Sequence, residues 1–497
     1  MKKIDSKDAS NWIKYCNYIW MGIPLIIAIW MAKMYLPDSD SFFLAATGRY
    51  IVETGKVPTI NPFVIHSNLG IIVQQWVTDI LNFIVYDNFG ENGMYVWAAL
   101  FLVISSGLLH KYLGSYTSNI RLRNWVTVAC LAVLFSFANT RPTSISLPLL
   151  LIELIILEKY NKNKESNIVW VIPLLSLVLI NCHSALWFFI FVMMMPYVVP
   201  GLNEFRKITK VKEHLAKYKK LWLVMIPTFL AGFINPNGIK GILYIYYSYS
   251  NVSEDTIISE LQSPNFNDFL GIYLIVAVIF ITIYVYKYNK NISWKNLYLA
   301  LGTFLLASQH SRNIWFIILG VTPLVVLVLD ECVKDTVKVK YKDDEYKLLS
   351  VVFTLALVVL FLIVDPAISY DEMDVYSAPT SAVEYLDNID SNKKNDIVLF
   401  TGFNNGAYLE WNGYKVYMDA RPELFEDKIG GQGDIYSEYI DVCKGNIDYA
   451  EFLDKYKFTH LILDSEVAFS TYLKCTGDYN IVVDIEDEYK LFERKDF

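Results

Sequence analysis

Long runs of apolar residues, separated by short polar connectors, dominate the first three quarters of the chain. A helix that spans a bilayer needs about 20 mostly apolar residues, and fewer where polar positions line a protein interior. Eleven runs fit this pattern, so we expect an α-helical polytopic membrane protein with about 11 transmembrane helices. The runs cover residues 12–32, 92–110, 124–139, 142–158, 167–182, 185–200, 221–235, 269–286, 296–309, 313–330 and 348–365.

The first long connector, residues 33–91, is too long for a simple loop and carries helical signals of its own. Apolar residues recur at helical spacing from Phe42 to Ile51, which predicts a helix lying along the membrane surface. A second amphipathic helix is expected from Gln74 to Tyr86.

The pattern changes after the last apolar run to the shorter periods of a soluble α/β domain. We therefore divide the chain into a membrane domain, residues 1–366, and a C-terminal domain, residues 367–497, which has an ordinary domain size. Its buried strands are predicted at 396–400, 415–418, 460–463, 481–485 and 489–492, and its helices at 380–388, 435–456 and 467–474.

Lysine and arginine are distributed unevenly between alternate connectors of the membrane domain. One set of connectors holds 25 basic residues and the opposite set holds six. Because positively charged short loops stay in the cytoplasm, this asymmetry predicts a cytoplasmic N-terminus. With an odd number of helices, the C-terminal domain is then extracytoplasmic.

Composition supports the membrane class, since 54% of the 497 residues are hydrophobic. Neither domain shows the basic stripe that binds a phosphate backbone, so we expect no nucleic-acid partner. The six cysteines form no CxxC pair and no zinc-type spacing. Cys443 and Cys475 could pair in an exported domain, and two separate thiols are an equal alternative.

The predicted orientation brings unusual polar residues to the extracytoplasmic side of the membrane. Ionisable groups near membrane depth are costly, so they suggest a functional site when they converge. The residues in question are Asp38, Asp40, Arg141, Asn181, His183, Glu260, His310 and Arg312.

Asp38 and Asp40 directly precede the predicted surface helix. One of them could simply cap that helix by accepting a backbone N–H bond. The two together exceed what a cap needs. One could instead take a proton from an acceptor hydroxyl, or Asp40 could bind a divalent cation such as Mg²⁺ or Mn²⁺ together with Glu260.

Arg141 and Arg312 lie in short outer connectors, where a planar guanidinium suits a lipid phosphate. Snorkelling to lipid headgroups is the alternative for each of them. His183 can likewise be a hydrogen-bonded residue at a helix end. Asp419 and Arg421 end a predicted strand, where α/β sheets often present ligands, although a structural ion pair explains them equally well.

Taken in order, these motifs resemble a group of bacterial polytopic membrane proteins related to GT-C glycosyltransferases, which use polyprenyl-phosphate-linked sugar donors. The resemblance covers nearly the whole chain. The matching stretches are Asp38-Ser-Asp40, Ala46-Thr-Gly48-Arg49, Asn61-Pro-Phe63, Gln75-Trp76, Arg141-Pro142, Asn181-Cys-His183, Asn235-Pro-Asn-Gly238, Glu260-Leu-Gln-Ser-Pro264, Arg312-Asn313, Gly406-Ala-Tyr-Leu409 and Tyr417-Met-Asp419-Ala-Arg421.

The resemblance implies a multi-pass protein of the bacterial cell membrane that transfers a sugar to an extracytoplasmic glycan, lipid or protein. It makes Asp38 or Asp40 the catalytic base or a metal ligand. The chain departs from the group at Leu44, where relatives often have histidine, and at Gln75, where they often have glutamate. Any catalytic role of those two positions is therefore not carried over.

Two other functions fit the same membrane scaffold. A transporter or flippase for a lipid-linked glycan would show internal repeats and broken helices near the bilayer midplane, and the sequence shows no clear repeat. A noncatalytic envelope assembly factor would use the helices only to anchor its acidic C-terminal domain, and its outer polar residues would point away from one another.

Overall fold

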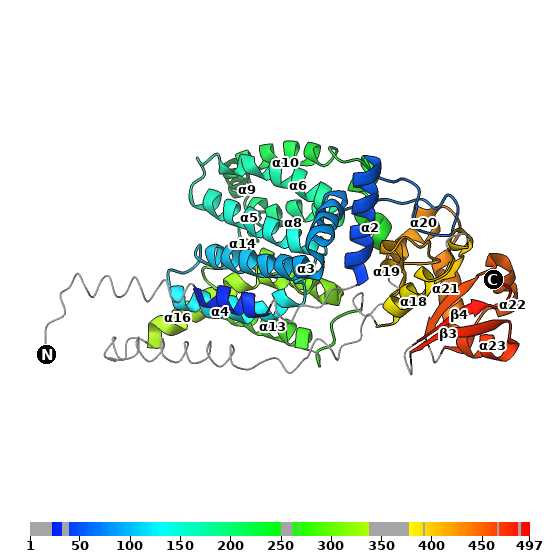
Figure 1. The fold of residues 1–497 in the computed structure, drawn as a ribbon. Helices are drawn as coiled ribbons and strands as arrows, with labels where there is room; N and C mark the ends of the chain where they lie inside the picture. The colour runs from blue at the N-terminus through cyan, green and yellow to red at the C-terminus, as the bar shows by residue number, and fades with distance from the viewer. Residues whose placement is uncertain are drawn as a thin grey trace, which may run out of the picture. The chain divides into compact units, whose positions relative to one another are not determined.

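The computed structural model describes residues 22–31, 39–249, 262–267, 269–336, 377–390, 393–464, 467–485 and 489–497 (Figure 1). The chain forms two compact units. The helical unit comprises residues 1–35, 94–235 and 251–367, and the mixed unit comprises residues 36–93, 236–250 and 368–497. The first long connector therefore clusters with the C-terminal domain, a grouping that the sequence did not indicate.

Most described helices of the helical unit overlap the predicted apolar runs, whereas the helix at Ile208–Lys217 lies in the connector between two of them. The second half of α3 (Trp76–Leu113) also belongs to this unit. The others are α4 (Ile120–Phe135), α5 (Thr143–Lys162), η1 (Ile168–Val171), α6 (Ile172–Cys182), α7 (Ser184–Trp187), α8 (Phe189–Val198), α9 (Ile208–Lys217), α10 (Lys219–Ala231), α13 (Phe269–Tyr288), α14 (Trp294–Gln309), η4 (Ser311–Asn313), α15 (Phe316–Gly320) and α16 (Thr322–Thr336).

The expected count of about 11 transmembrane helices is not supported. Among the described residues, α3 and α13 are long and apolar enough to cross a bilayer, and a bent pair at Ser311–Gly320 and Thr322–Cys332 makes a third if it counts as one span. The other runs yield helices that are shorter or carry more charge. Of the first predicted run only residues 22–31 are described, and the run at 348–365 lies outside the described residues.

Helix α13 presents apolar side chains on its exposed surface. Ile272, Ile275 and Ile279 are 51%, 43% and 48% exposed. A water-soluble protein rarely leaves such a contiguous apolar surface uncovered, and its backbone hydrogen bonds are satisfied within the helix. This surface and the long apolar helices indicate a membrane protein.

The mixed unit begins with α2 (Ser39–Thr54), which confirms the helix predicted there. Phe42 is 2% exposed and packs edge-to-face against Tyr86 and Tyr408, with ring centroids 5.7 and 4.9 Å apart. Tyr408 belongs to α19 (Gly406–Trp411). The apolar face of α2 is therefore covered by protein, whereas the sequence suggested that it faces the membrane surface.

The backbone of α3 leaves the helical conformation at Gly90, where φ is 56° and ψ is −145°. Glycine adopts this positive φ without the steric cost that a Cβ would impose. The break separates the two helices that the sequence predicted on either side of it.

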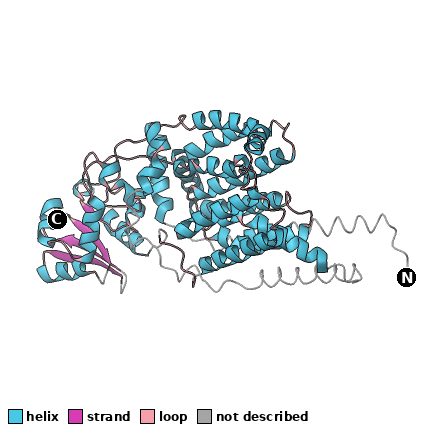
Figure 2. Ribbon diagram, turned by 180° about the vertical axis from the view of Figure 1, so that it is seen from behind, coloured by secondary structure: helices cyan, strands magenta, loops and turns pink. Residues whose placement is uncertain are grey.

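The remaining elements of the mixed unit build a four-stranded sheet with helices around it (Figure 2). The strand order is β1-β2-β4-β3, with β1 parallel to β2 and the other neighbours antiparallel. The strands are β1 (Leu399–Phe400), β2 (His460–Asp464), β3 (Tyr479–Ile485) and β4 (Tyr489–Arg494). The helices are α11 (Ile239–Ile242), α12 (Tyr244–Tyr249), α18 (Ser377–Asp387), η6 (Lys394–Asp396), η7 (Pro422–Leu424), α20 (Asp427–Gly430), α21 (Ile435–Lys444), α22 (Tyr449–Tyr456) and α23 (Ala468–Thr476).

The strand expected at 415–418 is reduced to isolated bridges around Val416. Val416 bridges Leu399 on one side and Val64 of the first connector on the other. Its amide N–H donates to the carbonyl of Phe63 at 3.0 Å, and its own carbonyl accepts from Ile65 at 3.0 Å. The connector thus extends the edge of the C-terminal sheet, which explains why the two segments share one core.

The helix predicted over 435–456 is divided into α21 and α22. Gly445 ends α21 with a left-handed φ of 73°, a conformation that glycine adopts at helix ends at little cost. Asp448 then starts α22 by accepting bonds from the amides of Ala450 and Glu451. Cys443 and Cys475 are both free thiols, so the two cysteines do not pair.

Gly48 permits α2 to approach α3 closely. A Cβ at this position would lie 2.0 Å from the carbonyl oxygen of Asp79. We expect Gly48→Ala to lower the free energy of unfolding by about 1–3 kcal/mol, the usual cost of overpacking. Urea unfolding measures the loss. Gly107→Ala is the control, because a Cβ at Gly107 meets nothing within 4 Å, and this variant should be as stable as the wild type or slightly more.

Candidate functional site

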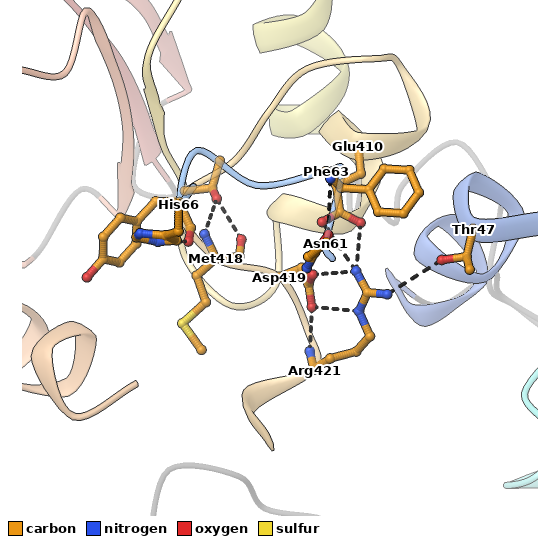
Figure 3. A network of polar contacts seen from close by, with 10 residues as sticks. Thr47, Asn61, Phe63, His66, Glu410, Met418, Asp419 and Arg421 are labelled. Carbon is orange, nitrogen blue, oxygen red and sulfur yellow. Dashed lines mark hydrogen bonds and ion pairs between the residues drawn. The ribbon is translucent and has the colours of Figure 1, made fainter. Parts of the chain in front are cut away.

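A buried polar network lies in the mixed unit, between α2 and the segment that follows α19 (Figure 3). The Arg421 guanidinium donates from Nε to Asp419 Oδ1 at 3.0 Å and from Nη2 to Asp419 Oδ2 at 2.5 Å. Nη2 also contacts Glu410 Oε2 at 3.2 Å, and Nη1 reaches Thr47 Oγ1 at 3.5 Å. The two carboxylates therefore share one cation.

The electrostatics of this network are asymmetric. Asp419 holds Arg421 by two short bonds, and this ion pair raises the pKa of Arg421 above its usual range although burial alone lowers it. Burial, followed by the nearby Asp419 carboxylate, raises the pKa of Glu410 well above its ordinary value. The 3.2 Å contact to Arg421 opposes this shift, but Arg421 is already neutralised by Asp419. The net effect is an upward shift of the Glu410 pKa, so the folded protein favours the protonated form of Glu410 relative to the unfolded chain.

The raised pKa of Glu410 predicts that the stability of the protein depends on pH. A carboxyl whose pKa is higher in the folded than in the unfolded protein binds an extra proton when folded, so stability is lost as pH rises above about 4.5 through the folded pKa. Glu410→Gln is uncharged at every pH and should lose less stability over that rise. Urea unfolding between pH 5 and 9 measures this, with the exposed Glu451→Gln as control. Equal slopes for wild type and Glu410→Gln would contradict the assignment.

Two arginines of the mixed unit also pack against aromatic rings. Arg421 lies 4.6 Å from the ring centroid of Phe43, and Arg49 lies 4.5 Å from that of Trp411. Arg49 Nη2 additionally donates to the Trp411 carbonyl at 2.6 Å. Through these contacts Arg49 and Arg421 join α2 to the segment around Trp411 and Arg421 of the C-terminal domain. The Asp419–Arg421 pair has the geometry of a structural ion pair.

A second polar cluster lies within the helical unit, where several helices break. His183 separates α6 from α7, and its Nδ1 is 2.7 Å from the Ser146 hydroxyl of α5. Arg312, in η4, is close enough for its charge to act on His183. Asn181 donates to the carbonyl of Ile234, just beyond α10, at 2.9 Å. His183 and Arg312, from two separate predicted connectors, thus lie in one unit with Ser146 and Asn181.

The turn that contains Arg141 belongs to the same end of α5. The Arg141 amide donates to Asn139 Oδ1 at 3.2 Å, and its carbonyl accepts from the Ser144 hydroxyl at 2.8 Å. His310 ends α14 in an extended conformation. The next residue, Ser311, donates from its amide to the carbonyl of Gln262 at 2.8 Å, which connects the η4 turn to the loop before α13.

The opposite end of α5 carries a different cluster. Glu158 accepts hydrogen bonds from Tyr116 and Tyr197, both at 2.7 Å, and forms a buried ion pair with Lys295. Ser146 and Glu158 are 12 residues apart on α5, so the two polar clusters lie about 18 Å apart along the helix. The basic residues around Glu158 lie in the connectors that the sequence placed in the cytoplasm.

The other predicted site residues are placed as follows. Asp40 is half-buried in the first turn of α2, where its negative charge interacts favourably with the positive end of the helix dipole. Asp38 and Glu260 lie outside the described residues. Among the residues that the structure describes, no three His, Cys, Asp or Glu side chains gather to hold a metal ion. Because Glu260 lies outside the described residues, the structure does not test the metal site predicted at Asp40 and Glu260.

Sequence reasoning missed Glu410, Thr47 and Glu153. Glu153 is fully buried in α5, and neither of its oxygens bonds to a described residue. Asp79, near the start of α3, is buried in the same way, although Gln75 and the charge of Arg421 are nearby. The signal for Glu153 was a glutamate within an apolar run, and Thr47 lies in the stretch Ala46-Thr-Gly48-Arg49, which carries the resemblance.

Comparisons with known proteins give a fold but no sequence family, because no protein-family profile and no curated protein sequence matches the chain. The fold is similar to that of the apo oligosaccharyltransferase of Archaeoglobus fulgidus, with a TM-score of 0.58 and 11% identity over 91% of this chain and 70% of that one. AglB from the same organism, in complex with an inhibitory peptide and a dolichol-phosphate, has a similar fold with a TM-score of 0.58. The two sequences are 11% identical, and the match covers 92% of this chain and 70% of that one.

A third structure, in which the Archaeoglobus fulgidus oligosaccharyltransferase is tethered through a disulfide bond to an acceptor peptide containing the NVT sequon, gives a TM-score of 0.57 and 11% identity. It covers 90% of this chain and 69% of that one. AglB is a glycosyltransferase of the GT-C fold. The predicted GT-C-like fold is therefore confirmed, at the level of fold.

Proposed function

We propose that this protein is a membrane glycosyltransferase that moves a sugar from a polyprenyl-phosphate-linked donor to an extracytoplasmic acceptor. The observation that carries the proposal is the likeness in fold to an oligosaccharyltransferase over 91% of the chain. One of the similar structures holds a dolichol-phosphate and another an acceptor peptide, which supports a lipid-linked donor and a separate acceptor. In this proposal the N-terminus is cytoplasmic and the C-terminal domain is outside.

The proposed reaction is a single displacement at the anomeric carbon. Asp38 or Asp40 takes the proton of the acceptor hydroxyl. The acceptor oxygen forms the new glycosidic bond while the bond between the anomeric carbon and the phosphate oxygen breaks, so polyprenyl phosphate leaves with the bonding electrons. The anomeric configuration inverts. No step requires a divalent cation, and Asp40 with Glu260 would hold one if it binds.

The polar cluster at the helix breaks of the helical unit supports the proposed binding of the donor phosphate. Arg141 and Arg312 each supply a guanidinium, whose planar donors match phosphate oxygens. His183 lies within the electrostatic reach of Arg312, and its hydrogen bond to Ser146 holds the ring between α5 and α6. Asn181 holds the same break through its bond to the Ile234 carbonyl.

Mass spectrometry of lipids that copurify with the full chain tests the donor assignment. We expect a polyprenyl phosphate or its sugar-linked form on the wild type, and at least a tenfold loss in Arg312→Ala, since a charged hydrogen bond contributes about 1.5–3 kcal/mol. Arg206→Ala, an exposed arginine between α8 and α9, is the matched control. Equal lipid on the two variants would remove Arg312 from the donor site.

A further inference from the structure

The mixed unit contains a small open pocket that the proposed reaction does not use. Its volume is about 190 Å³, and it lies between α2, the connector around Phe63 and the turn after α19. The side chains that bear on its chemistry are Arg49, Tyr50, Glu53, Phe63, Glu410 and Lys415. All of them belong to one unit, so the pocket is a feature of that unit itself.

The pocket offers charged groups that the protein does not satisfy. Arg49 is held by its bond to the Trp411 carbonyl and by the Trp411 ring, which leaves its other donors available. Neither Lys415 nor Glu53 forms an ion pair or a side-chain hydrogen bond with a residue that the structure describes, and both are exposed. Glu410 also lines the pocket, but its carboxyl contacts Arg421.

These groups leave two cations and one anion facing the pocket. The positive excess favours an anionic ligand, while the Glu53 carboxylate can accept hydrogen bonds from hydroxyl groups. Aromatic rings complete the lining: Tyr50 and Phe63 pack edge-to-face with centroids 6.0 Å apart. Aromatic surface combined with a few fixed polar groups is typical of a small-molecule site, and apolar C–H groups of a sugar ring match such a surface.

We propose that this pocket binds one acidic saccharide unit of uronic-acid type, with its carboxylate at Arg49 and Lys415 and its hydroxyls at Glu53. The small volume restricts the occupant to about one sugar ring. That the bound sugar is part of the acceptor rests on the proposed function, whereas the binding itself does not.

Saturation-transfer NMR on the full chain in nanodiscs, without any donor, tests the binding. The probes are methyl glucuronide, methyl glucoside and sodium acetate. We expect the glucuronide to bind at least about tenfold more tightly than the glucoside, since its carboxylate contacts both Arg49 and Lys415, and acetate alone to give no signal because it lacks the ring. Lys415→Ala should weaken glucuronide binding by about tenfold and leave glucoside binding unchanged, because Arg49 still holds the carboxylate, and Glu53→Gln should weaken both sugars.

Lys415 and Glu53 are exposed, and neither forms an ion pair or a side-chain hydrogen bond with a described residue, so we expect their variants to retain the fold. The matched controls are Lys474→Ala on α23 and Glu451→Gln on α22, both exposed and away from the pocket. Absence of glucuronide binding to the wild type, or equal binding to Lys415→Ala and Lys474→Ala, would overturn the proposal. If the protein binds glucuronide but transfers no sugar, only the proposed function is contradicted. If it transfers sugar but does not bind glucuronide, only the proposed saccharide site is contradicted.

Discussion

Replacing Arg421 by methionine is expected to lower the free energy of unfolding by about 3–5 kcal/mol, the cost of leaving a buried charge without its partner. Arg421 is 7% exposed and is the cation shared by Asp419 and Glu410, which are 0% and 1% exposed. Methionine fills a similar volume but neutralises neither carboxyl. Urea unfolding of the purified full chain measures the loss.

Arg494→Met is the control for this prediction. Arg494 pairs with the largely exposed Asp496 and donates from Nη1 to the Lys457 carbonyl at 3.0 Å, so we expect its loss to cost less than that of the buried Arg421. A further variant, Arg421→Met combined with Asp419→Asn, should recover part of the stability because it removes the unpaired charge. If Arg421→Met and Arg494→Met unfold at the same urea concentration, the network does not support the mixed unit.

Removal of the proposed catalytic carboxylate is expected to have the second large effect. We expect either Asp38→Asn or Asp40→Asn to lower the rate of sugar transfer by about 10²–10⁴-fold, the usual contribution of a general base. The same variant should regain activity as pH rises, because the acceptor hydroxyl then needs less help in losing its proton. A transfer assay in proteoliposomes measures both rates.

Asp441→Asn serves as the control for the aspartate variants, since Asp441 is an exposed carboxylate on α21. Unfolding in urea separates a lost fold from lost chemistry: Asp40 lies in the first turn of α2, where losing its charge costs about 0.3–1 kcal/mol through the helix dipole. Full activity in both Asp38→Asn and Asp40→Asn would remove the aspartates from the mechanism.

The local elements of this chain could be predicted because their signals are local. The apolar periodicity placed α2 and α13 correctly, and the break at His183 falls between two predicted runs. Membrane spans were overcounted, since a run of apolar residues fits a short helix buried within a bundle as well as a spanning helix. The prediction of one continuous helix over 435–456 was wrong for a different reason. Gly445 is a helix stop signal, and the prediction did not take it into account.

The tertiary arrangement could not be read from the sequence. Val64 and Val416 form a β-bridge although they are more than 350 positions apart in the chain. Neither segment carries a sequence signal that predicts this pairing. The Asp419–Arg421 pair was visible as neighbours, whereas its third partner, Glu410, was not, because its burial comes from the packing of α19 against α2. His183 and Arg312 both lie in the helical unit, where the charge of Arg312 acts on His183.

The release of free polyprenyl phosphate tests the central claim most directly. The full chain is reconstituted in proteoliposomes with a polyprenyl-phosphate-linked sugar fraction and an envelope extract as acceptor, and the lipid products are followed by mass spectrometry. The account predicts that wild-type protein converts the donor to polyprenyl phosphate while the sugar appears on the acceptor, and that the Asp38→Asn/Asp40→Asn double variant does not. A donor that stays intact equally with both proteins would contradict it.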